Sequence, residues 1–450
     1  MDRNLQDFFQ RAQVELEKFG FENWDIYCTQ EQARDISWRN KEIEDFKESS
    51  DSGYAIRILD KQKVSLVYAN NFDLAKITKN IENAKFILDY MTPDENFKMH
   101  GKIAPPLTQE EVDLSFNEVA LNKKIQSLAE FEELLFAQHP TIKKIEQIGY
   151  GEVKETSFYR TKYSPILEEE TTHYGYSADV IAQDGEEEES GSDFSYKRKF
   201  RDLDIAALAE KVAYNAYSML HSKPIRSGYY QVVLKNDIFA QFLSTFLDLF
   251  SADKVQNNKS VLAGKIGEQI ASSSLYLVDD GTLPGQLGSM LFDGEGTPAQ
   301  RTPLVKEGKL SGYLYDLKTA SKDKVQATGN ALRAGYQGSP AINPTNIIVG
   351  KGQSSYEDLI SAKDQVLVIN NVMGMHTSNL VNGDFSVGAT GYLMNNGGLI
   401  TPVKQITIAG NFLQLLSNIS NIASDVESFP YHGNIITPSV LISELSVSGV

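Results

Sequence analysis

The chain has 450 residues, enough for two or three domains with well-buried cores. It carries 43 lysine and arginine residues against 60 aspartate and glutamate residues, a formal net charge of −17, which disfavours direct binding to nucleic acid or to an anionic membrane. The one cysteine excludes an intramolecular disulfide and a cysteine-rich zinc site, and the lack of an apolar leader or of ~18 uninterrupted apolar residues predicts a cytoplasmic globular protein.

The first part of the chain is expected to form a small domain with helices at both ends. Apolar residues at helical spacing predict a helix over residues 5–19. Short alternating runs then predict a β-meander, with turns at Asn40 and at residues 51–53. Helical spacing returns over residues 74–88, so residues 1–92 are predicted to be one α+β domain.

A second α+β region is predicted after a linker. Three prolines among polar residues mark the linker at residues 93–116. The middle region then spans residues 117–224, and its acidic run Glu186 to Glu189 is interpreted as a solvated hairpin end. Its predicted elements are a helix over residues 121–135, strand-like runs within 142–200 and a helix over 205–219.

The remainder, residues 225–450, is predicted to be a large and mostly antiparallel β domain with a few helices, which makes the fold class α+β. A strongly apolar helix, DIFAQFLSTFLDLF, is expected at residues 237–250, and another helix at 412–422. Short strands are expected at residues 229–234, 275–278, 313–317, 346–350, 365–370, 391–395, 402–410 and 439–449.

Motifs of standard enzyme chemistry are missing from the sequence. Lys265 and Lys351 each follow a glycine, but neither is followed by the Ser or Thr of a phosphate loop. Ser289 lacks the second glycine of a nucleophile elbow. Cys28 lies on a predicted strand, which favours a core thiol over a nucleophile.

The six histidines are too far apart for a short zinc motif. No two of them lie within ten residues, so no helix can present two imidazoles on one face. A site assembled from distant residues, such as His376 and His432 with Asp384, remains an alternative.

Three stretches of the C-terminal half, residues 279–320, 327–352 and 379–416, resemble the TldD/PmbA family, also called modulators of DNA gyrase. The third contains NGDFSVGATGYL and ITIAGN, which are similar to the PmbA, or TldE, branch. The N-terminal half resembles the family more loosely, chiefly through SGYAIRIL at residues 52–59.

The resemblance implies that this chain lacks the zinc site of its relatives. One branch of the family is a zinc peptidase with His-Glu-x-x-x-His on a helix and a later Cys ligand, and the PmbA/TldE branch lacks these ligands and pairs with the first. The corresponding helix here is residues 237–250, with the motif positions near Leu243, Ser244 and Asp248, and it contains no His. Zinc is therefore expected only in a TldD-type partner, because Leu cannot coordinate a metal ion.

Two groups of polar residues are candidates to line a substrate cleft. Each group could also be structural. The residues of the group around Asp384 could form a turn, and the acids of the group around Asp280, which also contains Glu295, could be turn residues paired with Arg301. The candidates are His376, Asn382, Asp384 and Ser386 in one group, and Asp279, Asp280, Asp293 and Arg301 in the other.

Three hypotheses about function follow. The first is a non-catalytic PmbA/TldE-type subunit that joins a TldD-type zinc partner, or a second copy of itself, in a dimer that acts on unfolded proteins or peptides. The second is a self-sufficient homodimeric peptidase or hydrolase that uses acids such as Asp280, Asp293 and Asp384 with His376. The third is a protein-binding modulator that affects DNA gyrase without touching DNA.

Overall fold

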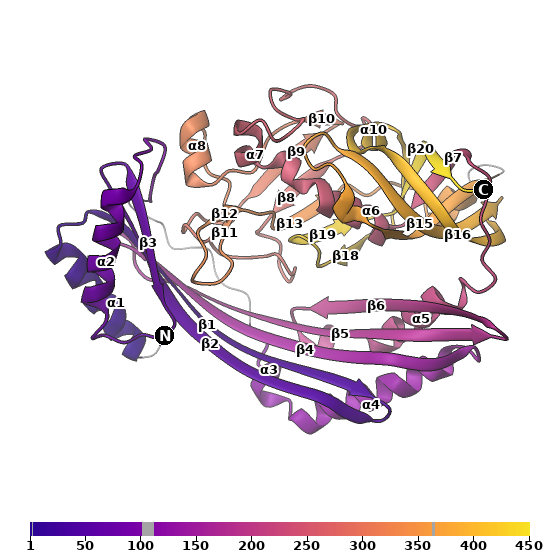
Figure 1. Cartoon of the computed structure of the whole chain (residues 1–450), viewed down its shortest axis with the longest axis horizontal. Coiled ribbons are helices and arrows are strands. Elements are labelled where there is room, and N and C mark those ends of the chain that lie inside the picture. The colour runs from indigo at the N-terminus through magenta and orange to yellow at the C-terminus, as the bar shows by residue number, and fades with distance from the viewer. Residues whose placement is uncertain (2, 101–111, 362–364) are drawn as a thin grey trace.

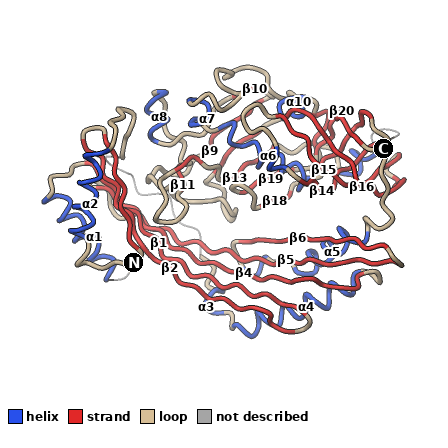
Figure 2. The backbone as a smooth tube through the Cα atoms, in the orientation of Figure 1, coloured by secondary structure: helices blue, strands red, loops and turns tan. Residues whose placement is uncertain are grey.

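A computed structural model of the chain describes residues 1, 3–100, 112–361 and 365–450. A long, bent sheet with helices forms one side of the molecule, and a β-rich domain lies across from it (Figure 1). Strands make up more of both parts than helices do, and loops connect many short strands in the C-terminal domain (Figure 2). The predicted α+β class is confirmed, with a helix and an antiparallel meander followed by a large β domain that contains a barrel.

The two N-terminal regions share one six-stranded antiparallel sheet. β1 pairs with β4 from Asp25 opposite Thr161 to Trp38 opposite Ile148, so hydrogen bonds run continuously between the regions. The domain boundaries predicted at residues 92 and 117 stay a prediction. The strands, in sheet order, are β3 (Lys63–Ala69), β2 (Glu42–Asp60), β1 (Asn23–Arg39), β4 (Ile142–Thr161), β5 (Leu167–Asp184) and β6 (Glu187–Lys197).

Helices cover this sheet in two groups, each over its own apolar core. α1 (Arg3–Lys18) and α2 (Ile77–Tyr90) pack at one end of the sheet, around a core that includes Cys28, and the prediction of a core thiol is confirmed. α4 (Leu121–Gln138) and α5 (Ile205–Tyr217) cover the other end. The short α3 (Ser115–Glu118) and η1 (Phe200–Asp202) complete this part.

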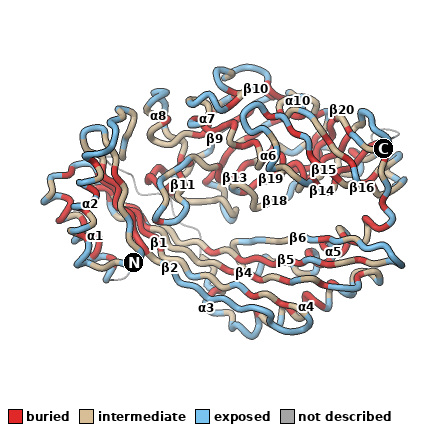
Figure 3. The backbone as a smooth tube through the Cα atoms, in the orientation of Figure 1, coloured by how far each residue is buried: buried red, intermediate tan, exposed pale blue. Residues whose placement is uncertain are grey.

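The turn predicted at residues 51–53 is wrong, because β2 runs unbroken through it. Gly53 permits close packing and does not form a turn. A Cβ there would lie 2.4 Å from the ring of Tyr336, which belongs to the C-terminal domain. Residues 42–51 of β2, which precede Gly53 and do not pair with β3, are exposed (Figure 3). A charged, exposed strand is easily mistaken for a series of loops.

The C-terminal domain contains a closed barrel and a second six-stranded sheet. An additional pairing between β16 and β20 closes the barrel. The strands of the barrel sheet, in order, are β16 (Gly398–Asn411), β15 (Asp384–Asn395), β14 (Val366–Met373), β7 (Gly228–Leu234), β20 (Val440–Ser448) and β17 (Ile419–Ile422). Those of the other sheet are β10 (Lys309–Leu310), β9 (Arg301–Lys306), β8 (Leu277–Asp280), β13 (Asn346–Val349), β19 (Asn434–Thr437) and β18 (Glu427–Phe429). A two-stranded sheet pairs β11 (Ala331–Leu332) with β12 (Ala341–Ile342).

One apolar core joins the barrel and the second sheet, and α6 (Asn236–Phe246) lies in it. The helix continues into the tighter turn η2 (Leu247–Phe250) and is followed by α7 (Ala252–Gln256). The other short helices are α8 (Leu317–Asp323), α9 (Tyr356–Ser361), η3 (Met375–Thr377) and α10 (Phe412–Ser417). Within the part of the chain that the structure describes, no helix has the length and apolar character needed to cross a membrane.

Two predicted elements of this domain are wrong. The helix predicted at residues 412–422 ends at Ser417, and Ile419 and Ile422 belong to β17. An irregularity in the pairing of β17 with β20 lets both isoleucines reach the core, which imitates helical spacing. Residues 313–317 form no strand, because Asp316 caps α8 through a capping box with Thr319.

Candidate functional site

The helix expected to match the family's zinc helix, residues 237–250, is a core element in this structure. Leu243 is fully buried among apolar side chains from both sheets. The Ser244 hydroxyl oxygen accepts a hydrogen bond from the backbone N–H of His432 at 3.2 Å. Asp248 lies beyond the last α-helical residue, in η2, and forms an ion pair with Lys254 at 3.5 Å. All three positions therefore have structural contacts.

These residues do not fit a zinc ion. Zinc in proteins is held by three or four nitrogen, sulfur or oxygen ligands in near-tetrahedral array. Leu243 offers no ligand atom, and the ring of His432 is hydrogen-bonded to the side-chain oxygen of Asn343 at 2.9 Å. Nowhere in residues 1, 3–100, 112–361 and 365–450 do three or more His, Cys, Asp or Glu side chains gather as a metal site would require.

The candidate loop around Asp384 is a hydrogen-bonded turn. Both carboxylate oxygens of Asp384 accept side-chain N–H groups, from Asn382 at 2.7 Å and from Asn411 at 2.8 Å. Gly383 has a φ of +87°, which favours glycine. His376 and Ser386 are exposed. Of the four candidates, the structure joins only Asn382 and Asp384, and their contacts hold the turn closed.

The paired acids Asp279 and Asp280 have different partners. Asp279 is buried and accepts hydrogen bonds from the backbone and hydroxyl of Thr345 and from the side chain of Asn330. Burial raises the pKa of Asp279 to about 6, and these hydrogen bonds partly oppose that rise. Asp280 lies 3.4 Å from Arg301, the pairing that the structural interpretation of the sequence expects.

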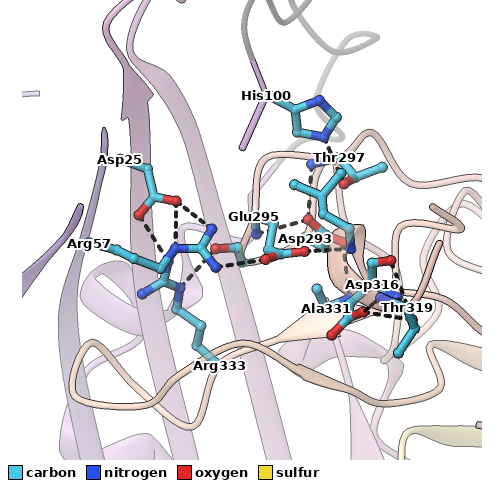
Figure 4. Close-up of polar contacts among 12 residues, drawn as sticks. Asp25, Arg57, His100, Asp293, Glu295, Thr297, Asp316, Thr319, Ala331 and Arg333 are labelled. Carbon is cyan, nitrogen blue, oxygen red and sulfur yellow. Dashed lines mark hydrogen bonds and ion pairs between the residues drawn. The ribbon is translucent and has the colours of Figure 1, made fainter. Parts of the chain in front are cut away.

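Asp293 and Glu295 belong to a buried network of charges that sequence reasoning missed (Figure 4). Asp293 accepts three backbone N–H groups, and burial, followed by the nearby charge of Glu295, raises its pKa to about 7. Glu295 pairs with Arg57 at 2.7 Å, and Arg57 also pairs with Asp25. The network therefore joins the C-terminal domain to the N-terminal sheet.

A second arginine completes this network. Arg333 has a fully buried side chain, lies 3.2 Å from the other oxygen of Asp25 and places its guanidinium 4.9 Å from the ring centre of Tyr27. One feature of the sequence indicates this network. Asp25 is a single charge between the buried residues Trp24 and Ile26, and Arg57 is a single charge between the buried residues Ile56 and Ile58. They also lie opposite each other in the register of β1 and β2.

Further contacts connect the bent sheet to the loop of residues 286–291. Glu169 of β5 accepts the backbone N–H of Leu291 at 2.8 Å. Arg198, just after β6, donates to the backbone oxygens of Gln286 and Ser289. Among the described residues, no hydrogen bond or ion pair joins any two of the proposed catalytic residues Asp280, Asp293, Asp384 and His376.

Two sheet edges flank a cavity of about 500 Å³ between the bent sheet and the C-terminal domain. β6 is the last strand of its sheet and β18 is the last strand of another, so each has a backbone edge without a neighbouring strand in the described chain. Residues 193–197 of β6 and 426–430 around β18 both line the cavity. The rest of the wall comes from α5 and its N-cap Asp204, from Gln286 and from Ile436 of β19. We name this space the edge cavity.

Comparisons with known proteins cover the whole chain. Family models match residues 24–88, 114–220 and 227–449, and they describe domain 1, the central domain and the C-terminal domain of PmbA/TldA metallopeptidases. An uncharacterized protein of Methanocaldococcus jannaschii is 30% identical over 94% of this chain and 96% of its own length. A protein of Buchnera aphidicola, named a metalloprotease PmbA homolog, is 27% identical over 92% of this chain and 90% of its own.

Solved structures share the fold. A Thermotoga maritima protein, described as a candidate modulator of a DNA gyrase, has a TM-score of 0.89 at 26% identity, over 99% of this chain and all of its own. The crystal structure of TldE from Thermococcus kodakarensis has a TM-score of 0.90 at 22% identity, over 97% of this chain and all of its own. At that identity, the second likeness concerns the fold alone.

Proposed function

This chain belongs to the PmbA/TldD family, and we propose that it is a PmbA/TldE-type subunit of a metallopeptidase system that acts on unfolded proteins or peptides. In this proposal the chain does not catalyse cleavage by itself. A TldD-type subunit supplies zinc, and the assembly works in the cytoplasm.

The observation that carries the proposal is the state of α6. At the positions expected to match the family's histidines, Leu243 offers no ligand atom and is packed in the domain core, and the carboxylate of Asp248 pairs with Lys254. Without a ligand set and without a glutamate, the chain has neither a Lewis acid nor a general base on this helix. Cleavage therefore requires another subunit, while this chain keeps the complete three-part fold of the family.

The edge cavity supports binding of an extended polypeptide. A strand can add to a free sheet edge through backbone hydrogen bonds, which tolerate many side chains and require an unfolded segment. β6 and β18 present two such edges to one space. The candidate residues Asp279, Asp280, Asp293 and Arg301 lie on β8 and β9 or on the loop between them. We propose that these two strands and the loop between them, which contains Gln286, support the wall of the edge cavity.

The two alternative functions make different demands on the structure. A self-sufficient hydrolase would need Asp280, Asp293, Asp384 and His376 to act together, although their hydrogen bonds and ion pairs serve separate turns and loops. A second copy of this chain could replace the TldD-type partner. An effect on gyrase is proposed to run through protein contacts, because a net charge of −17 opposes DNA binding.

The test is cleavage of a reduced, unfolded protein by the purified chain supplied with zinc. We expect no cleavage by the chain alone and cleavage once a family member with His-Glu-x-x-x-His is added. A partner whose motif Glu is replaced by Gln is the matched control, and it should bind this chain without restoring activity. Chelator-sensitive cleavage by the single chain would refute the proposal, and alanine substitution of His376, His432 and Asp384 would then locate the site.

A further inference from the structure

The edge cavity carries a cluster of aromatic rings. Phe194 and Tyr196 project from β6, with ring centres 5.7 Å apart. Phe429 of β18 stacks on Tyr431 at 6.0 Å, and Phe194 meets Tyr431 edge-on at 6.1 Å. Three of these rings, Phe194, Tyr196 and Phe429, line the cavity, and Tyr431 packs against two of them. The faces of aromatic rings attract cations through their negative quadrupole.

Carboxylates accompany the rings. Asp193 lines the cavity, and among the described residues its carboxylate accepts one hydrogen bond, from the backbone N–H of Phe194 at 2.7 Å. Burial raises the pKa of Asp193, and the charge of Asp237, in the first turn of α6, raises it further. The Oδ1 atom of Asp237 is itself buried and has no hydrogen-bond partner in the described part of the chain. The two acids thus have more acceptor capacity than their neighbours use.

The other charged groups of the cavity are already engaged or exposed. Lys211 of α5 forms an ion pair with Glu427 of β18. Asp204 caps α5 by accepting two backbone N–H groups. Lys197 is exposed. Lys211 and Lys235 lower the pKa of Asp193, but burial has the larger effect.

We propose that the edge cavity binds a positively charged side chain, lysine or arginine, of an extended polypeptide that lies beside β6. Aromatic rings and a carboxylate that line the same cavity are the chemistry that recognises ammonium and guanidinium groups. A volume of about 500 Å³ accommodates such a side chain with its flanking backbone. The inference rests on the proposed function, because it names the kind of unfolded segment that the cavity prefers.

The first experiment measures the binding of two small probes to the full chain by calorimetry. Arginine amide and citrulline amide have nearly the same shape, and only the first has a charged side chain. We expect arginine amide to bind about tenfold more tightly, since one charge-assisted contact and one cation–π contact are gained. Asp193→Asn should remove most of this preference. Asp202→Asn, an equal loss of charge at an exposed position outside the cavity wall, should preserve it.

The second experiment uses unfolded peptides that differ in one residue, lysine against acetyl-lysine. Peptide binding without a preference for lysine would overturn this inference and leave the proposed function standing. A preference for arginine amide without binding of any peptide would support the cation site and refute the proposed peptide binding. Equal binding of both members of each pair to the wild-type chain would overturn the inference outright. Phe429→Leu, which keeps the apolar wall and removes a ring, should also weaken the preference if Asp193→Asn does not fold.

Discussion

Arg57 and Glu295 lie 238 positions apart in the chain, yet their side chains form a buried ion pair with 2.7 Å between Nη1 and Oε1. Arg57 is on the N-terminal sheet, and Glu295 is on a loop of the C-terminal domain. A buried charge that loses its partner is costly, so this pair fixes how the two parts meet.

Replacing one partner of this pair should destabilise the protein strongly. We expect Glu295→Gln to lower the free energy of unfolding by about 3 kcal/mol, because Arg57 and Arg333 would then share the single carboxylate of Asp25. Urea unfolding measures the change. Glu82→Gln removes the exposed pair with Lys79 and should cost about 0.5 kcal/mol or less. Equal effects of the two substitutions would contradict the assigned importance of burial.

The junction between β5 and the loop of residues 286–291 should respond to pH. Burial raises the pKa of Glu169 to about 7, well above its ordinary value, while Arg198 lowers it and Glu155 raises it. The folded state therefore keeps this proton while the unfolded state loses it near pH 4. The stability that this proton provides is complete below about pH 4 and is lost as the pH rises through about 7.

Glu169→Gln should remove this pH dependence, because the amide does not titrate. The amide oxygen can still accept the N–H of Leu291, so the contact itself is kept. Unfolding at pH 5 and pH 8 should show the variant gaining stability relative to wild type as the pH rises. The same change at Glu186, on the exposed hairpin tip, is the control. A constant difference between wild type and Glu169→Gln across this range would show that the carboxyl group does not titrate there.

The α6 positions expected to match the His-Glu-x-x-x-His motif should behave as structural residues. Leu243→Ala should cost about 2–5 kcal/mol of stability, because it opens a cavity in the core. Ser244→Ala should cost about 1 kcal/mol, the value of its hydrogen bond to the His432 backbone. Neither change should alter the zinc content of an assembled complex. Loss of zinc in step with Ser244→Ala would point instead to a ligand role.

Two glycines on neighbouring strands should differ in their tolerance of alanine. A Cβ on Gly191 would lie 2.3 Å from the backbone nitrogen of Ala216 in α5, and neither backbone can move easily. Gly191→Ala should therefore cost about 3 kcal/mol. A Cβ on Gly175 meets the ring of Tyr196, which is exposed and free to turn away. Gly175→Ala should cost less than about 1 kcal/mol by thermal unfolding.

Periodicity located most of the elements, because amphipathic helices and alternating strands are local features. The first helix, the meander, α4, α5, α6 and most barrel strands lie where the sequence predicts them. Errors came where tertiary contacts decide. The irregular pairing of β17 places Ile419 and Ile422 at a spacing that is typical of a helix. Gly53 is required for close packing against Tyr336, but a glycine after Asp and Ser also predicts a turn.

The site was predicted less completely than the fold. That residues 237–250 contain no histidine can be read from residue types alone, and no backbone geometry can make Leu243 a ligand. The pairing of Asp280 with Arg301 is also local. The charge network of Asp25, Arg57, Glu295 and Arg333 joins distant segments, and no pattern within one segment states which charge meets which.

The pairing of β1 with β4 has a consequence for the covalent chain. Fourteen consecutive residues of β1, Asp25 to Trp38, lie opposite residues of β4, and the two strands are separated by more than a hundred positions in sequence. A single peptide-bond cut between residues 91 and 114 would leave two fragments that still share a continuous sheet. Such a nicked molecule should migrate as one species in its native form and as two after denaturation. Conversely, the first fragment made alone would expose the whole partner edge of β1, and it should fold in good yield when the second fragment is supplied.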